Sequence, residues 1–166
     1  EKVVEINNWQ KNRISKKIVQ KLFGTVAGKK LAILGYAFKA NTNDTRETPS
    51  KTIAEDLIEE GAFLAIHDPK VDKTNIENDL GMQYTKDDFL NLNAGGWCFF
   101  KDLQEAIKGA DAVIIITDWD EYRNIDWNNA STIMRFPAWI FDARLVVNKE
   151  DLKNTNLNLW QLGTTN

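Results

Sequence analysis

The sequence has little of several residue types, and each shortage excludes a class of protein. A single cysteine, Cys98, cannot form a disulfide within the chain, and one cysteine with one histidine cannot supply a structural zinc site. The 21 basic and 24 acidic residues give a net charge of −3, which offers no electrostatic basis for general binding to nucleic acid or anionic membranes. No apolar run is long enough to span a membrane. We therefore expect a cytoplasmic protein without a metal site.

The length and the first residues bear on domain organisation. A chain of 166 residues that is 43% hydrophobic and 27% charged is typical of one globular domain. It opens with EKVVEINNWQKNR, which has no initiator methionine and is too polar for a signal sequence. We expect the C-terminal piece of a longer protein.

The beginning of the chain has the pattern of an amphipathic helix. Apolar residues recur at helical spacing on a basic background from about Val4 to Leu22. They are Ile6, Trp9, Ile14, Ile18, Val19 and Leu22. This helix is predicted to lead into the domain.

Apolar strand patterns then alternate with helical patterns. The clearest helix is predicted over residues 49–60, with Thr48 as its N-cap, Pro49 in its first turn and Gly61 beyond its end. The predicted strands are 31–34, 63–67, 97–100, 112–117, 139–142 and 157–162, and further helices are predicted over 103–108 and 127–134. This alternation predicts an α/β class, Rossmann-like three-layer fold with helices on both faces of a mostly parallel sheet.

The stretch from Lys70 to Gly96 departs from this pattern. It is polar and contains the turn signals DPK, NDLG and NAGG. We interpret it as an excursion from the core with one short strand near residues 82–85.

The first strand ends in an incomplete dinucleotide-binding fingerprint. A G-x-G-x-x-G pattern placed on Gly35 finds alanine at the other two positions, Ala37 and Ala40. Both Cβ atoms hinder the approach of a pyrophosphate, and the next helix starts about a dozen residues later, so its N-terminus need not face a phosphate. From these residues alone, a strand, loop and helix without any ligand remains an open alternative.

The loop that follows carries the two cations of interest. Lys39 and Arg46 lie beyond the carboxyl end of a strand, where open α/β sheets bind ligands. The surrounding residues, GYAFKANTNDTRETPS, resemble a signature of the nucleotide-sugar dehydrogenases that oxidise UDP-glucose, GDP-mannose and related sugars. Similar signatures recur in order as HDPKV at 67–71, TDWDEY at 117–122 and FDARLV at 141–146. The resemblance covers nearly the whole chain.

The resemblance implies a place in a larger enzyme. Such enzymes have an N-terminal NAD-binding domain, a central helix that builds a homodimer, and a C-terminal domain that covers the sugar nucleotide. Residues 1–24 are similar to the end of the central helix, and residues 25–166 to the C-terminal sugar-nucleotide-binding domain. The resemblance is strongest to members that oxidise UDP-glucose to UDP-glucuronate in two NAD-dependent steps. NAD is then bound mainly by a domain absent from this sequence, and the chain by itself is expected to be inactive.

The resemblance also implies individual roles. Phe38, Lys39 and Arg144 would contact the UDP-sugar, and Arg46 would reach NAD as a charge-assisted donor. The alternatives are a solvated Lys39 and an Arg46 that pairs with an acid of its own loop, Asp44 or Glu47. Position 143 is alanine where such enzymes commonly have glycine.

Two further side chains are interpreted as structural. These enzymes use a cysteine nucleophile, but its motif precedes the central helix, whereas Cys98 lies in an apolar run and is predicted to be a buried, inert thiol. Asp68 stands where a dinucleotide-binding fold places its ribose-binding acid, and here the pair Asp68–Pro69 is predicted to shape a turn.

Two alternatives for function stay open at this point. One is the same domain of a GDP-mannose or UDP-N-acetylhexosamine dehydrogenase. The other is a stand-alone nucleotide-binding module without catalysis.

Overall fold

One parallel sheet organises the molecule. The computed structural model describes residues 13–81 and 95–163, and within them six strands lie in the order β3-β2-β1-β4-β5-β6. Their bounds are β1 Lys30–Leu34, β2 Phe63–His67, β3 Gly96–Phe99, β4 Ala112–Ile115, β5 Trp139–Asp142 and β6 Asn158–Gln161. Each pair of neighbours is parallel. The predicted Rossmann-like α/β fold is confirmed, and the strand order reverses between β1 and β4.

The central strands form because their residues suit burial on both faces. Strand β1 reads KLAIL, β2 reads FLAIH and β4 reads AVII, and nearly all of these side chains are buried. Continuous runs rich in Val, Ile and Leu are typical of parallel strands covered by helices on both sides. In register, Leu31 lies between Leu64 of β2 and Ala112 of β4.

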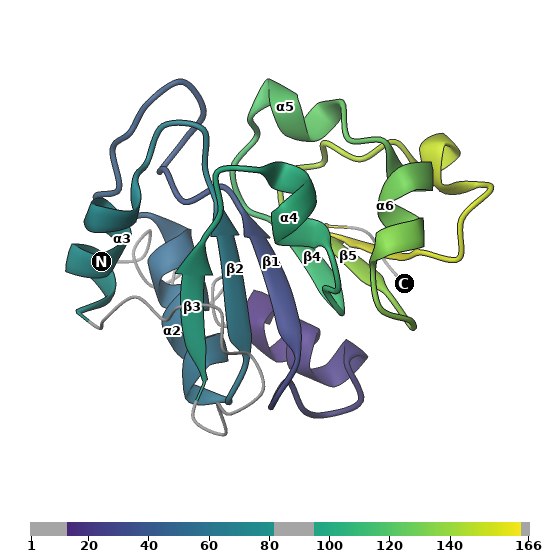
Figure 1. Cartoon of the computed structure of the whole chain (residues 1–166), viewed down its shortest axis with the longest axis horizontal. Coiled ribbons are helices and arrows are strands. Elements are labelled where there is room, and N and C mark those ends of the chain that lie inside the picture. The colour runs from purple at the N-terminus through teal and green to yellow at the C-terminus, as the bar shows by residue number, and fades with distance from the viewer. Residues whose placement is uncertain (1–12, 82–94, 164–166) are drawn as a thin grey trace.

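Helices cover both faces of the sheet. In Figure 1, α4 (Leu103–Ile107) and α6 (Trp127–Ile133) lie in front of the sheet, whereas α2 (Pro49–Glu59) and the helical residues 13–21 lie behind it. Helix α2 buries a stripe that includes Ile53, Leu57 and Ile58. This arrangement gives the three layers that the sequence predicts.

The capping residues fix where the helices start and stop. The side chain of Thr48 accepts a hydrogen bond from Ser50 N at the start of α2, and that of Asp102 accepts from Gln104 N at the start of α4. Gly61 follows the end of α2 with a φ of +89°, a conformation that glycine adopts without strain. The bounds predicted for α2 are thus confirmed to within one residue.

The excursion predicted between Lys70 and Gly96 is partly wrong. It contains α3 (Lys73–Leu80), which Asp72 caps at its start and Gly81 ends in the left-handed conformation. Only Ile76 and Leu80 of α3 are buried. The apolar residues in this stretch of the sequence are therefore too few to show a helical period. The strand predicted near residues 82–85 lies outside the described residues.

Two other short elements were not predicted. Helix α5 (Asp120–Arg123) and the 3-10 helix η1 (Lys149–Leu152) have four residues each. One helical turn is too short to establish a period in the sequence.

The amphipathic pattern at the N-terminal end is confirmed where the structure describes it. Ile14, Ile18 and Leu22 are buried in the same hydrophobic core as the sheet. Ile6 and Trp9 lie outside the described residues. None of the helices formed by residues 13–81 and 95–163 has the length and apolar character needed to cross a membrane.

Gly35, the residue after β1, leaves no room for a side chain because Thr117 lies against it. Its φ is +97°, and a Cβ atom at this position would lie 2.4 Å from the side chain of Thr117, beyond β4. Both the backbone conformation and the lack of space therefore exclude a side chain.

We predict that Gly35→Ala lowers the free energy of unfolding by about 2–5 kcal/mol. About 1–2 kcal/mol comes from the left-handed backbone and a further 1–3 from the overlap with Thr117. Urea denaturation measures the loss. The control is Gly109→Ala, where φ is +70° but nothing lies within 4 Å of the added Cβ, so only the backbone cost of about 1–2 kcal/mol should be lost. Equal losses in the two variants would contradict this account.

Candidate functional site

The loop after β1 begins at the point where the strand order reverses, which is where open α/β sheets bind ligands. Two hydroxyl groups tie the start of α2 to this point. Thr48 Oγ1 donates to Tyr36 O at 2.7 Å, and Ser50 Oγ donates to Gly35 O at 2.7 Å. The start of α2 is about a dozen residues from the strand in sequence, yet these two bonds hold it beside the end of β1.

The outer part of this loop carries Phe38 and Lys39. A backbone hydrogen bond of 2.7 Å from Phe38 N to Asp44 O closes the loop. Asp44 N in turn donates to Thr42 Oγ1. The Phe38 side chain is 46% exposed, and Lys39 is exposed beside it. The loop therefore presents an aromatic face and a cation at the carboxyl edge of the sheet.

Arg46 is paired within the same loop. Its Nη2 lies 2.8 Å from Asp44 Oδ2 and its Nε donates to Asp44 Oδ1 at 3.0 Å. These bonds from Arg46 lower the pKa of the Asp44 carboxyl to about 2. An Arg46 paired with an acid of its own loop was one of the two alternatives for this residue. The Arg46 side chain is nevertheless 88% exposed. An exposed pair of this kind contributes little to stability, so the arginine can exchange one anionic partner for another.

Arg144 approaches the same edge of the sheet from β5. Its backbone N–H donates to Asp142 Oδ1, and its guanidinium lies 3.1 Å from Asp118 Oδ1. Asp142 is fully buried and also accepts from Val147 N and Gln161 Nε2. One carboxylate thus fixes the backbone of the loop and another holds the side chain of the arginine.

The structure places the predicted residues on two loops of one sheet edge. Phe38, Lys39 and Arg46 share the loop after β1, and Arg144 follows β5, with β4 between the two strands. Thr117 Oγ1, beyond β4, donates to Ala37 O at 2.9 Å and joins the middle strand to the first loop. Asp118, the partner of Arg144, was not predicted, because the TDWDEY motif carries no signal for an ion pair with an arginine 26 positions later.

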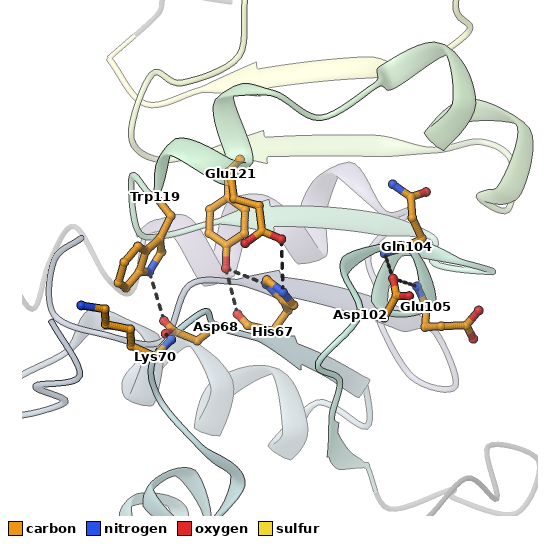
Figure 2. A network of polar contacts seen from close by, with 9 residues as sticks. His67, Asp68, Lys70, Asp102, Gln104, Glu105, Trp119 and Glu121 are labelled. Carbon is orange, nitrogen blue, oxygen red and sulfur yellow. Dashed lines mark hydrogen bonds and ion pairs between the residues drawn. The ribbon is translucent and has the colours of Figure 1, made fainter. Parts of the chain in front are cut away.

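Asp68 brings three of the four sequence motifs together. Its Oδ2 accepts from Tyr36 N at 2.8 Å and Ala37 N at 2.9 Å, while its Oδ1 accepts from Lys70 N and Val71 N. Trp119 Nε1 adds a longer bond of 3.3 Å to Oδ2, as Figure 2 shows. The predicted role of Asp68 in a turn is confirmed. Its bonds to the other two motifs were not predicted.

His67 lies beside Asp68 in a second buried cluster. Its Nδ1 is 2.9 Å from the hydroxyl of Tyr122, which donates to His67 O. Its Nε2 lies 3.7 Å from Glu121 (Figure 2). Burial lowers the pKa of His67, against the opposing effect of the Glu121 charge. The folded protein therefore favours the neutral imidazole.

We predict that stability falls as the pH drops below about 6.5, the ordinary pKa of histidine. In that range the unfolded chain binds a proton at His67 that the folded chain resists, so the free energy of unfolding decreases by up to about 1.4 kcal/mol per pH unit. His67 is the sole histidine of the sequence. Urea denaturation between pH 5 and 8 should show a shallower pH dependence for His67→Gln than for the wild type. An identical pH dependence of the free energy of unfolding in the two proteins would contradict the assignment of this effect to His67.

Cys98 is a core residue. It lies in β3 and is 2% exposed, which confirms the prediction of a buried thiol. Within the part of the chain that the structure describes, no three His, Cys, Asp or Glu side chains are grouped to hold a metal ion.

A cavity of about 390 Å³ lies away from the predicted site. Residues of the helical segment 13–21 and of the second half of α2 line it, including Ser15, Val19, Asp56 and Leu57. Two of its lining residues bond to each other, since Ser15 Oγ donates to Asp56 Oδ2. None of the predicted site residues takes part in its lining.

Comparisons with known proteins give the chain a family. Residues 32–149 match the model of the UDP-glucose/GDP-mannose dehydrogenase family, UDP binding domain. The chain is 38% identical to the UDP-glucose 6-dehydrogenase of Caenorhabditis elegans over 98% of its length and 33% of that protein. It is also 38% identical to UDP-glucose 6-dehydrogenase 4 of Oryza sativa subsp. japonica, over 97% of this chain and 35% of that protein. The chain thus spans about a third of the length of these relatives.

Solved structures agree on the fold. A UDP-glucose dehydrogenase from the hyperthermophilic archaeon Pyrobaculum islandicum superposes with a TM-score of 0.69 at 24% identity, over 96% of this chain and 30% of that one. An NDP-N-acetyl-D-galactosaminuronic acid dehydrogenase from Methanosarcina mazei Go1 gives the same score at 21% identity, over 93% and 28%. Fold, ordered motifs and family match agree, and the chain belongs to the UDP-glucose/GDP-mannose dehydrogenase family, as its UDP-binding domain.

Proposed function

We propose that this chain is the sugar-nucleotide-binding part of an NAD-dependent UDP-glucose 6-dehydrogenase, which oxidises UDP-glucose to UDP-glucuronate. The observation that carries the proposal is identity of 38% to proteins of that name over nearly the whole chain. These relatives are about three times as long, so the remaining functions belong to sequence beyond the matched third. Residues 1–24 are proposed to be the end of the central helix through which the enzyme forms a homodimer, and residues 25–166 the binding domain.

The substrate is proposed to bind at Phe38, Lys39 and Arg144. The exposed phenyl ring of Phe38 offers an apolar surface, and the ammonium of Lys39 offers a charged donor to ligand oxygens. Arg144 has a planar guanidinium that suits oxyanions or paired hydroxyls, and its loop is already ordered by Asp142. Asp118 would then orient Arg144 toward the ligand.

The residues after β1 do not fit the pyrophosphate of NAD. The N–H groups of Tyr36 and Ala37, which would face it, already donate to Asp68. We therefore propose that NAD is held mainly by another domain, and that this chain contributes Arg46, whose exposed guanidinium can leave Asp44 for a phosphate. A cytoplasmic location is part of the proposal and suits a cysteine, Cys98, that forms no disulfide.

The proposal predicts different defects for the cations in the complete enzyme. Lys39→Ala and Arg144→Ala should each weaken UDP-glucose binding about ten- to a hundredfold and leave binary NAD binding nearly unchanged. Arg46→Ala should do the reverse. A hydrogen bond to a charged group contributes roughly 1.5–3 kcal/mol, which corresponds to these factors. Isothermal titration with each ligand measures both constants, and GDP-mannose serves as a competing sugar nucleotide.

The matched control is Lys101→Ala, which removes an exposed lysine from the same edge of the sheet beyond β3. It should leave both affinities unchanged, and thermal stability should change little in all four variants. If Lys39→Ala and Arg46→Ala weaken the same ligand equally, the division of the loop between two ligands is wrong. Tighter binding of GDP-mannose than of UDP-glucose would replace the proposed substrate.

A second prediction concerns the 166-residue chain alone. It should form no NADH from UDP-glucose and NAD above background, because the residues after β1 do not accept a pyrophosphate and the one thiol, Cys98, is buried. Absorbance at the NADH band measures this, with the complete enzyme as positive control. Turnover by the chain alone would return Cys98 to consideration as a nucleophile.

A further inference from the structure

The five groups that donate hydrogen bonds to Asp68 are arranged like an anion-binding site, and the Asp68 carboxylate is the anion in it. Tyr36 N and Ala37 N are consecutive N–H groups that follow a glycine of positive φ, and both point at Oδ2. Successive backbone N–H groups at such a turn make a concave site for anions. In dinucleotide-binding folds the corresponding groups after the first strand face a phosphate.

The Asp68 carboxylate fills this site completely. Lys70 N and Val71 N donate to Oδ1 at 2.8 and 2.9 Å, and Trp119 Nε1 approaches Oδ2 from the segment after β4. The residue is only 4% exposed, so water does not replace these donors. All five donors are neutral N–H groups, and each places the positive end of its dipole at the carboxylate.

The origin of this carboxylate explains how it reaches the site. Asp68 directly follows β2, the strand next to β1 in the sheet. An acid at the end of this strand usually points outward to a ribose hydroxyl of a dinucleotide. Here the turn formed with Lys70 and Val71 directs Oδ2 back to the N–H groups after Gly35.

We propose that the Asp68 carboxylate occupies the position that a phosphate takes after β1 in dinucleotide-binding folds. It thereby prevents a dinucleotide from binding to this domain. It is thus a specificity-determining residue, since ligands are confined to the outer loop of Phe38 and Lys39. The occupation of this site by Asp68 rests on its hydrogen bonds alone, whereas the confinement of ligands to the outer loop rests on the function proposed above. It implies that removal of the carboxylate leaves a pocket for a small free anion.

The test is rescue of Asp68→Ala by formate, which is a carboxylate without the rest of the side chain. The variant of the 166-residue chain should melt about 10 °C below the wild type, because four backbone N–H groups lose their acceptor. Sodium formate should recover at least half of this loss, relative to sodium chloride at equal ionic strength, and should shift the amide resonances of Tyr36 and Ala37. The wild type should show neither effect.

The matched control is Ile66→Ala, which opens a cavity two residues earlier in β2, where the side chain is fully buried but apolar. Formate should stabilise it no more than chloride does. The proposal is overturned if formate fails to shift the Tyr36 and Ala37 amides of folded Asp68→Ala, or if the wild type and Ile66→Ala respond equally.

A second measurement decides the matter if Asp68→Ala does not fold. In the wild type, the amide protons of Tyr36 and Ala37 should resonate downfield and exchange slowly with solvent, and both should move upfield in Asp68→Asn. Exchange in the wild type as fast as in exposed loops would overturn the proposal.

Discussion

A carboxylate buried at position 68 must keep its hydrogen-bond donors, and this requirement fixes the carboxyl edge of the sheet. A buried polar group that loses its hydrogen-bond partner destabilises the fold by about 1–3 kcal/mol, and by more when the group is charged. The donors come from residues 36–37, 70–71 and 119, which are up to 51 positions apart from Asp68 in sequence. The three segments are therefore joined at one carboxylate, and the loop that presents Phe38 and Lys39 starts from this junction.

A second buried aspartate orders a loop in a similar way, two strands away from β1 in the sheet. Asp142 is the last residue of β5, whereas Asp68 directly follows β2, and Asp142 too accepts backbone N–H groups of the loop that comes after it. Gln161 of the edge strand β6 donates to it and also to Val147 O, which ties the loop to the sheet from the other side. Ordered loops on either side of the strand reversal reduce the entropy that ligand binding must remove.

Local sequence signals predicted the fold well, but they could not predict the polar contacts between residues far apart in the sequence. The strands and α2 carry continuous apolar runs, a capping threonine and a terminal glycine, which act within a few residues. Helix α3 buries only Ile76 and Leu80, and its period was too weak to detect. Family resemblance supplied Lys39, Arg46 and Arg144. The donors from Tyr36 and Ala37 are backbone groups, and side-chain identity carries no signal for them.

The close approach of Gly35 and Thr117 has a consequence for how such sequences evolve. A glycine after the first strand of this fold is commonly taken as a trace of nucleotide binding, yet here the packing against Thr117 and the φ of +97° already exclude any larger residue. Selection on packing is therefore enough to keep this glycine whether or not a phosphate binds there. Positions 35 and 117 should therefore vary as a pair across relatives, with a larger residue at one tolerated only where the other becomes smaller and the turn changes its backbone conformation.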